Sequence, residues 1–322
     1  MRALVVLAIA GVLVGCGGSG TRGGFAHRAW LASESRAVFD GGGEVFDEAV
    51  PFWNLAEGSA AAEVRVRGGR GGRGGGAGVV WGPWFGLTGP GASEGEGWRL
   101  DIDTLLGDAE VYEVERVGRG ADGAQGGGVI GIVATREDRD VKIGPARGER
   151  VALRVPFRSQ RTDDAALKGR LCSPTSAAMV MAYWGVDVSV GQVAAAAHDP
   201  FHDVYGNWPR NMQAVHELSS GKLRAEVRRF STFGELRAEL ERGRPVVISV
   251  AGRLRGAPYS PTEGHLLVVR GMTSAGDVLV NDPAFGTEAE GAREYRWEDL
   301  REAWLRNRRG TAYVIAPAEE GR

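Results

Sequence analysis

The distribution of glycine limits how this 322-residue chain can fold, because 35 of its 51 glycines lie in the first 150 residues. Between the glycine clusters, short segments alternate apolar and charged residues with a period of two, at residues 63–67, 98–103 and 111–115. Residues 129–135 are a further candidate strand. Short alternating segments separated by turn-forming residues are typical of antiparallel strands with one face in water. We therefore expect residues 25–145 to form a β-rich accessory domain, mostly antiparallel and sandwich-like.

The rest of the chain, residues 151–317, has an ordinary glycine content and predicts a different fold. Helices are expected at residues 171–184 and 232–242, and strands at residues 245–250, 266–269 and 278–280. Gly185 and Gly243 supply the stop signals of the two helices. Because helices and strands do not alternate as βα units, the pattern predicts an α+β domain. The charged segment 137–150 lacks apolar periodicity and is the expected linker.

The N-terminus has the pattern of an export signal. Arg2 precedes an apolar run over residues 3–14 that is too short to span a bilayer comfortably. The run ends in Leu-Val-Gly before Cys16, which resembles the lipobox of bacterial lipoproteins, where the cysteine is acylated. The resemblance implies a signal peptide over residues 1–15, a flexible tether over residues 16–24, and a lipid anchor on Cys16. The protein would then lie on the outer face of the cytoplasmic membrane, or in the periplasm or outer membrane. The alternative is a plain signal peptide whose cysteine is incidental.

Charge and cysteine content exclude several function classes. The formal net charge is −2, which gives no electrostatic case for nucleic acid or for anionic membrane surfaces. Residues 68–78 hold eight glycines and two arginines, as nucleic-acid-binding segments can, but in an exported protein a long hairpin loop is the better interpretation. Two cysteines, Cys16 and Cys172, exclude a disulfide scaffold and a multi-cysteine metal site. We expect no cofactor.

Two groups of residues leave alternatives open. His198 and His202 lie near Asp199 and Asp203, but no further ligand set accompanies them, so we expect no metal there. Four tryptophans of the first half could form a sugar-stacking platform, or could be core residues or a docking face for the second half. They are Trp53, Trp81, Trp84 and Trp98. We favour the second interpretation.

Cys172 stands at the predicted start of a helix. Unpaired N–H groups and the helix dipole favour negative charge there, so they lower the pKa of a thiol. Acyl transfer also needs hydrogen-bond donors for the oxyanion. Gln160, a short distance upstream, is the candidate donor, with the Cys172 backbone N–H as the second.

His265 opens one predicted strand and Asp282 follows another. If the two strands form a hairpin that pairs residue 269 with 278 and residue 267 with 280, then His265 lies opposite Asp282. Cross-strand partners have Cβ atoms about 4.5–5.5 Å apart. At that distance an aspartate can orient a histidine and stabilise its imidazolium form. A thiolate beside such a histidine is the requirement for a cysteine nucleophile.

From about residue 151 to 317 the sequence resembles the C39-like cysteine peptidases. These are papain-like proteins related to the domain that cleaves double-glycine bacteriocin leaders. The resemblance rests on motifs in the same order at residues 155–160, 172–176, 182–185, 206–209, 264–269 and 280–284. One departure is Ser173, where better-known relatives often carry glycine, and it leaves substrate preference open.

The resemblance implies a papain-like fold and a role for each matching residue. Cys172 is the nucleophile, His265 the general base, Asp282 the residue that orients it, and Gln160 part of the oxyanion hole. Asn207 and Trp208 lie in a further motif that we expect near the cleft. There Trp208 could wall the substrate-binding side, or could simply anchor its loop.

These observations predict an exported, membrane-anchored cysteine peptidase that acts on peptides or proteins. One alternative is an amidase or transpeptidase that acts on cell-wall peptides with the same residues. Another is a non-catalytic surface binding module, in which the β-rich part holds a glycan or a protein partner. The sequence contains no ATP-binding signature, so it does not predict a leader-peptide exporter. Substrate specificity and oligomeric state are not predicted.

Overall fold

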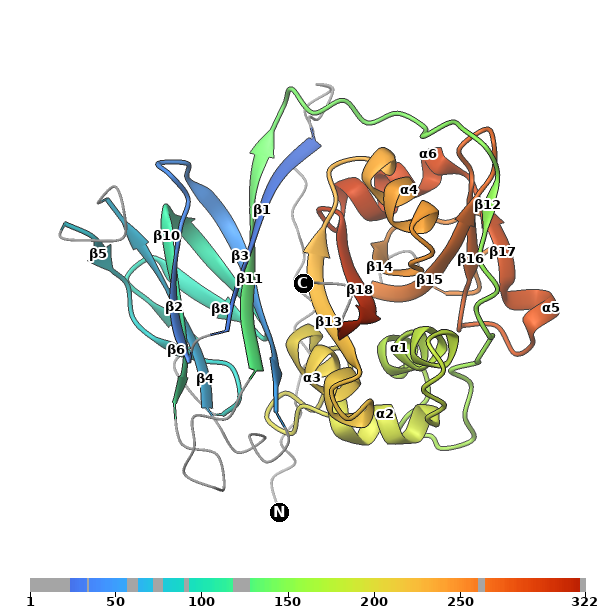
Figure 1. Ribbon diagram of the computed structural model, residues 1–322, viewed down its shortest axis with the longest axis horizontal. Coiled ribbons are helices and arrows are strands. Elements are labelled where there is room, and N and C mark those ends of the chain that lie inside the picture. The colour runs from blue at the N-terminus through green and yellow to red at the C-terminus, as the bar shows by residue number, and fades with distance from the viewer. Residues whose placement is uncertain are drawn as a thin grey trace, which may run out of the picture.

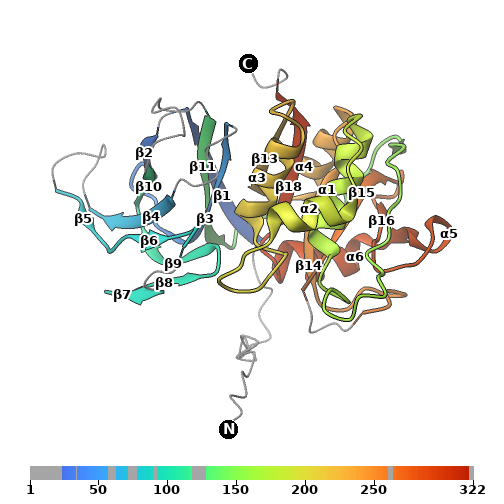
Figure 2. The same cartoon turned by 90° about the horizontal axis from the view of Figure 1, so that it is seen from below.

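A computed structural model describes residues 24–33, 35–56, 63–71, 78–89, 93–117, 128–259 and 264–318. The predicted signal peptide, Cys16, nearly all of the tether and residues 72–77 of the glycine-rich segment lie outside the described residues. None of the helices within the described ranges is both long and apolar enough to cross a membrane. The two halves of the chain lie side by side in both views (Figures 1 and 2).

The described part of the first half forms two antiparallel sheets. One has the order β1-β11-β3-β9-β8-β7, and the other has the order β2-β10-β4-β5, with β6 also paired to β4. The strands are β1 (Gly24–Ala32), β2 (Arg36–Asp40), β3 (Phe46–Leu55), β4 (Glu63–Arg70), β5 (Val80–Trp81), β6 (Phe85–Gly86), β7 (Glu94–Gly95), β8 (Trp98–Asp101), β9 (Thr104–Ala109), β10 (Val111–Val117) and β11 (Gly128–Asp138). Both sheets contribute to one buried apolar cluster. The predicted antiparallel strands are therefore present in two packed sheets.

Two of the four tryptophans belong to the core of this half. Trp53 and Trp98 are buried among its apolar side chains. Trp81 and Trp84 are partly exposed, and the guanidinium of Arg67 lies 4.5 Å from the ring centroid of each. The prediction of core tryptophans is thus confirmed for Trp53 and Trp98.

The second half is built around one antiparallel sheet whose strands differ in length. Their order is β13-β18-β14-β15-β16-β17, with β12 paired to β15. Its strands are β12 (Val151–Ala152), β13 (Leu223–Arg229), β14 (Val246–Ala251), β15 (Gly264–Met272), β16 (Val278–Asn281), β17 (Ala292–Tyr295) and β18 (Thr311–Pro317). Its helices are α1 (Cys172–Tyr183), α2 (Val190–Ala197), α3 (Trp208–Leu218), α4 (Phe233–Glu241), α5 (Glu288–Gly291), α6 (Trp297–Leu300) and the π-helical turn η1 (Arg301–Arg306). The whole chain is a mixed α/β structure with mostly antiparallel sheets. The predicted helices and strands of this half are present, with ends that differ by a few residues.

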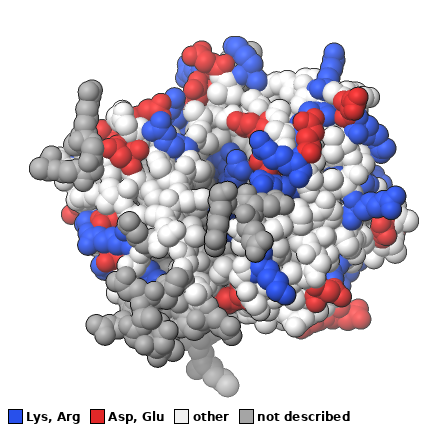
Figure 3. All heavy atoms as spheres, in the orientation of Figure 1, with Lys and Arg blue, Asp and Glu red and all other residues white. Residues whose placement is uncertain are grey.

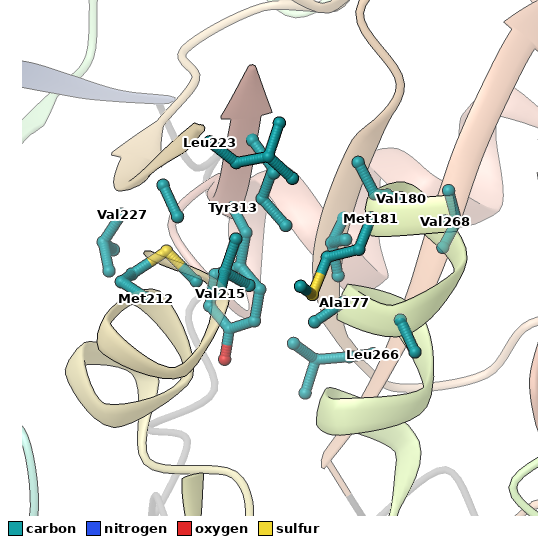
Figure 4. Close-up of a cluster of buried hydrophobic side chains, with 14 of the residues drawn as sticks. Ala177, Val180, Met181, Met212, Val215, Leu223, Val227, Leu266, Val268 and Tyr313 are labelled. Atoms are coloured by element: carbon teal, nitrogen blue, oxygen red, sulfur yellow. The ribbon is translucent and has the colours of Figure 1, made fainter. Parts of the chain in front are cut away.

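Alternation along the strands gives this sheet a core on each face. On β15, Leu266 and Val268 join the cluster beneath α1, α2 and α3, whereas Leu267 and Val269 join the cluster beneath α4, α6 and η1. Figure 4 shows the first cluster, where Tyr313 of β18 lies between α1 and α3. Each fully buried apolar side chain contributes about 1.5–3 kcal/mol. Because both faces are covered there, the strands β14, β16 and β18 are nearly continuous runs of apolar residues, whereas β13 and β17 at the edges are not.

The two halves share a buried junction at β3. Ala49, Trp53 and Leu55 face the core of the first half, whereas Val50 and Phe52 join the α1–α3 cluster of the second. The expectation of one face in water holds for β2, β4 and β8, whose residues alternate between buried and more exposed, but it is wrong for β3. Its outer face is covered by α3 and β13, because long-range packing decides which alternating face is solvated.

Hydrogen bonds also connect the two halves at this junction. Asn54 Nδ2 donates to the Ala225 carbonyl oxygen at 2.7 Å, and its Oδ1 accepts from the Ala225 N–H at 2.9 Å. Gln213 of α3 makes the matching pair with the backbone of Leu55, at 2.7 and 3.1 Å. Arg229 forms a buried ion pair with Glu48 across the junction. The contact between the halves is thus specific as well as apolar.

The linker is shorter than predicted. Residues 137 and 138 still belong to β11, where Asp138 pairs with Gly24 of β1, and the irregular connection runs over residues 139–150. Charged residues at a strand end cannot be told from a linker by periodicity alone, because the pairing with β1 is long-range.

Acidic and basic side chains are interspersed over the face shown in Figure 3, in keeping with the near-neutral net charge.

Candidate active site

A cleft of about 340 Å³ lies where the two halves meet, and Cys172 is in its lining. Trp208, Leu266 and Arg308 also line it from the second half, and Ile102 and Asp103 from the first half. The first half reaches the cleft with the tight turn between β8 and β9. Cys172 is therefore open to a ligand on a surface that both halves build.

Cys172 is the first residue of α1, as predicted. The helix has no side-chain cap at its start, so Cys172 lies where backbone N–H groups lack helical partners. Burial raises the pKa of the thiol, but the hydrogen bond and charge of His265, with the N–H groups of Leu266 and Ser173, lower it more. The net pKa is below the ordinary value, which favours a thiolate at neutral pH.

His265 lies between Cys172 and Asp282. Its Nε2 is 2.8 Å from Asp282 Oδ1, and it also hydrogen-bonds the thiol. Burial lowers the pKa of the imidazole, but the hydrogen bonds and charges of Asp282 and Cys172 raise it more, to about 9. A raised imidazole pKa and a lowered thiol pKa together describe a thiolate–imidazolium pair. The structure thus brings together the three residues that the sequence pattern singled out.

The hairpin that carries His265 and Asp282 has a different register from the predicted one. Val269 pairs with Val280 and not with residue 278, and a bulge between Val269 and Gly271 shifts the pairing further. The sequence does not show this bulge, so the assumed regular ladder was wrong. His265 and Asp282 are still close, because diagonal neighbours on a sheet stay within reach of long side chains.

Asp282 is fully buried, and each of its carboxylate oxygens has a partner. Oδ1 accepts from His265 and from the Ala284 N–H at 3.0 Å, and Oδ2 accepts from the Tyr295 hydroxyl at 2.8 Å. A buried carboxylate is stable only when such partners satisfy it. Tyr295 was not among the predicted site residues, because no motif links a residue on β17 to Asp282.

A second tyrosine packs on the imidazole. The Tyr259 ring centroid lies 4.2 Å from that of His265 at 39°. Its hydroxyl is buried and has no hydrogen-bond partner within the described part of the chain. Burial and the nearby negative groups raise the pKa of Tyr259 above its ordinary value, so the hydroxyl keeps its proton.

Comparison with known families identifies the second half. Residues 152–312, half of the chain, match the Peptidase_C39 like family. The chain belongs to this family. The matched segment contains Cys172, His265 and Asp282, and membership points to a peptidase. The strands β1 to β11 lie outside the matched residues.

Solved structures with partial similarity carry related names. A C39-like peptidase from Bacillus anthracis is 20% identical with a TM-score of 0.41, and the match covers 52% of this chain and 98% of that one. A double-glycine-motif protease from an AMS/PCAT transporter, in complex with the leader peptide, is 20% identical with a TM-score of 0.36, covering 55% and 100%. The peptidase domain of Streptococcus ComA, a bi-functional ABC transporter involved in quorum sensing, is 14% identical with a TM-score of 0.35, covering 53% and 99%. No curated protein matches the chain.

Within the family segment, Gln160 lies beside the aspartate. Its backbone N–H donates to the Pro283 carbonyl oxygen at 2.9 Å, directly after Asp282. The Oε1 atom of Gln160 is buried and has no hydrogen-bond partner among the described residues. Asn281 holds the same upstream segment, because its Nδ2 donates to the Val155 carbonyl oxygen at 2.9 Å. The segment that carries Gln160 is therefore tied to the strand that ends at Asp282.

Asn207 and Trp208 both line the cleft, at the start of α3. Asn207 is buried, and its side chain caps the helix by accepting from the Arg210 N–H and donating to Asp199. The Trp208 N–H donates to Asp103 Oδ2 at 2.7 Å. Burial raises the pKa of Asp103 to about 6, against the Trp208 and Thr104 hydrogen bonds that lower it. A carboxylate of the first half thus holds α3 of the family segment in place.

The β8–β9 turn has one strained residue. Ile102 has φ 58°, in the left-handed region that a β-branched residue rarely adopts. The sequence predicted an extended strand through residue 103, whereas β8 ends at Asp101 and the chain turns back into β9. The sequence lacks the glycine that usually marks such a turn.

The histidines near α2 form separate pairs. His198 Nε2 is 3.0 Å from Asp203, and His202 Nδ1 is 2.9 Å from Asp199. Within the residues that the structure describes, no group of three or more His, Cys, Asp or Glu side chains could hold a metal ion.

Proposed function

We propose that the protein is a cysteine peptidase with a papain-like domain that hydrolyses peptide bonds through Cys172, His265 and Asp282. The observation that carries the proposal is the position of His265, which hydrogen-bonds both the Cys172 thiol and a fully buried aspartate. A low-pKa thiol at a helix start, paired with an oriented histidine, is the arrangement of a cysteine nucleophile.

The reaction follows from these positions. The Cys172 thiolate attacks the scissile carbonyl carbon, and Gln160 and the Cys172 backbone N–H donate hydrogen bonds to the oxyanion. His265 gives its proton to the leaving amine as the C–N bond breaks, which leaves a thioester on Cys172. His265 then takes a proton from water as the water attacks the thioester, and the acid product leaves. Asp282 holds the imidazole in one orientation throughout. Trp208 lies on the cleft wall as a substrate-binding residue, and Asn207, whose side chain is engaged in capping α3, supports that wall.

We also propose that the protein is exported and held at a membrane by a lipid on Cys16. The basic start, the short apolar run and the cysteine after Leu-Val-Gly support this. The test is detergent-phase partition and mass spectrometry of the N-terminal peptide from the full chain and from Cys16→Ser. We expect a lipid-bearing N-terminal peptide from the full chain and no such peptide from Cys16→Ser. An unmodified Cys16 in mature protein would refute the anchor.

Alkylation tests the nucleophile without any knowledge of the substrate. The full chain is treated with iodoacetamide near neutral pH, and peptide mapping measures the rates at Cys172 and in a model thiol. We expect Cys172 to react faster, and His265→Ala to slow it toward the model rate. A rate at Cys172 no higher than that of the model thiol would contradict the proposal.

A peptide library separates hydrolysis from other functions of the same site. Wild type and Cys172→Ala are incubated with a proteome-derived library, and new termini are read by mass spectrometry. New carboxyl termini in wild type alone support hydrolysis. An added amine that becomes incorporated into the product would indicate an amidase-type or transpeptidase acyl transfer. Partner binding without turnover would indicate a binding module.

A further inference from the structure

Arg308 brings a positive charge into the cleft beside Cys172. It follows η1, and its guanidinium lines the cleft and packs on Gly264, the residue before His265. A Cβ atom added at Gly264 would collide with the Arg308 Nη2 atom. Glycine at this position therefore leaves room for the arginine next to the candidate catalytic residues.

The guanidinium has no anionic partner among the described residues. Within the described residues no carboxylate forms an ion pair with it, and its buried Nε has no hydrogen-bond acceptor there. Burial lowers the pKa of Arg308, against the charges of Asp103, Glu48 and Cys172, which raise it. A partly desolvated guanidinium without a partner is costly for the fold, unless a ligand supplies the missing anion.

The carboxylates of the neighbourhood are already engaged. Asp103 accepts from the Trp208 N–H and from the Thr104 hydroxyl at 3.0 Å. Asp101, which also lines the cleft, is exposed and lies 4.0 Å from Arg99. Glu48 pairs with Arg229 and with Arg309. These contacts engage the nearby carboxylates elsewhere, and within the described residues none of them forms an ion pair with Arg308.

We propose that Arg308 forms a carboxylate-binding subsite beside Cys172, so that the cleft prefers peptides with an acidic group near the scissile bond. The inference rests on the proposed peptidase function. Arginine suits this role because its planar fork matches a carboxylate with two parallel hydrogen bonds. The carboxylate can come from an Asp or Glu side chain or from the C-terminus of the peptide.

Two alkylating reagents, one anionic and one neutral, test the subsite directly. Iodoacetate carries a carboxylate and iodoacetamide does not, and both report on the same thiolate. We expect the rate ratio of iodoacetate to iodoacetamide at Cys172 to exceed that of a model thiol, and to fall roughly tenfold in Arg308→Met. Arg308→Lys should retain part of the preference, because it keeps the charge. Arg255→Met is the control, since Arg255 pairs with Asp299 at the surface and does not line the cleft.

The ratio keeps this inference separate from the proposed function. Loss of a neighbouring charge changes thiolate reactivity toward both reagents, so only the ratio reports carboxylate binding. If Arg308→Met fails to fold, Arg308→Gln takes its place, since the His265 imidazolium also attracts iodoacetate and the wild-type ratio alone does not isolate Arg308. An unchanged ratio in Arg308→Met, or a wild-type ratio equal to that of the model thiol, would overturn the subsite. Slow reaction of Cys172 with iodoacetamide would instead refute the nucleophile.

Matched peptides then identify the source of the carboxylate. A peptide cleaved by wild type is compared with its Glu→Gln and Asp→Asn versions and with its C-terminal amide. We expect one of these changes to lower kcat/KM in wild type, mainly through KM, and to have little effect in Arg308→Met. A drop for Glu→Gln or Asp→Asn assigns the subsite to a side chain, and a drop for the amide assigns it to the terminus. Equal kcat/KM for all versions would contradict the inference.

Discussion

Tyr295 and His265 hold opposite oxygens of one buried carboxylate. The Tyr295 hydroxyl donates to Asp282 Oδ2 at 2.8 Å, and His265 Nε2 lies 2.8 Å from Oδ1. Since Tyr295 ends β17 and His265 is near the start of β15, the carboxylate is fixed from two strands of the sheet. The orientation of the imidazole therefore depends on Tyr295 through the carboxylate that both residues bind.

Tyr295→Phe should slow the reaction without removing any proposed catalytic group. It leaves Asp282 Oδ2 buried without a partner, which costs about 1–3 kcal/mol of folding free energy. We expect kcat to fall several-fold and the alkaline limit of activity to shift. Urea denaturation measures the loss of folding free energy, and a pH–rate profile measures kcat and the alkaline limit of activity. Tyr183→Phe, which removes a comparable 2.8 Å bond to the Gly243 carbonyl oxygen away from the site, should change stability alone. An identical pH profile in Tyr295→Phe would count against the positioning role.

The pH dependence of hydrolysis and of alkylation should differ at the alkaline end. The pKa of Cys172 is lowered and that of His265 is raised to about 9, so the ion pair exists between these two values. As pH falls through the thiol pKa, both reactions should slow. As pH rises through about 9, His265 loses the proton that the leaving amine needs, so hydrolysis should fall while alkylation continues. Asp282→Asn should move the alkaline limit to lower pH. Parallel alkaline limbs for the two reactions would refute this assignment.

Ile102→Gly should raise stability and widen the cleft at once. A left-handed backbone costs a β-branched residue about 1–2 kcal/mol, and the added freedom of glycine in the unfolded chain offsets part of the gain. We expect a net stabilisation of about 0.5–1 kcal/mol in urea denaturation. Reaction of Cys172 with a bulky maleimide should speed up relative to iodoacetamide.

Glu96→Gly is the matched control, because Glu96 has φ 50° in a turn that does not line the cleft. It should show a similar stabilisation and no change in reagent preference. If both variants change the preference equally, the β8–β9 turn is not a wall of the cleft.

Asn54→Ala should weaken the junction between the halves. β13 is the edge strand of its sheet, and the Asn54 side chain satisfies both backbone groups of Ala225 on that edge. Two buried backbone groups without partners should cost roughly 2–4 kcal/mol, measured by urea denaturation. Asn307→Ala removes one exposed bond to the Ala251 carbonyl oxygen and should cost less than about 1 kcal/mol. Equal losses would mean that Asn54 is not a junction residue.

Local patterns were sufficient for much of the site. The helix start at Cys172 and the strand at His265 follow from short-range signals, namely helix-forming residues before a glycine and a run of apolar residues. The closeness of His265 and Asp282 was predicted although the register was wrong, because a hairpin brings its two arms together under any nearby register.

The remaining features depend on contacts that are distant in the sequence. Tyr295 reaches Asp282 only after β17 has paired with β16. The outer face of β3 is dry because α3 and β13 cover it, and an alternating strand looks the same whether water or protein lies on that face.

The sequence by itself predicted a β-rich first half and an α+β second half, and it singled out Cys172, His265 and Asp282 as candidate site residues, because these predictions depend on local periodicity and side-chain chemistry. Only the tertiary structure decided that the β8–β9 turn and Arg308 line the cleft. Their placement results from the packing of one half on the other, and packing energy is summed over many weak long-range contacts that no short segment encodes.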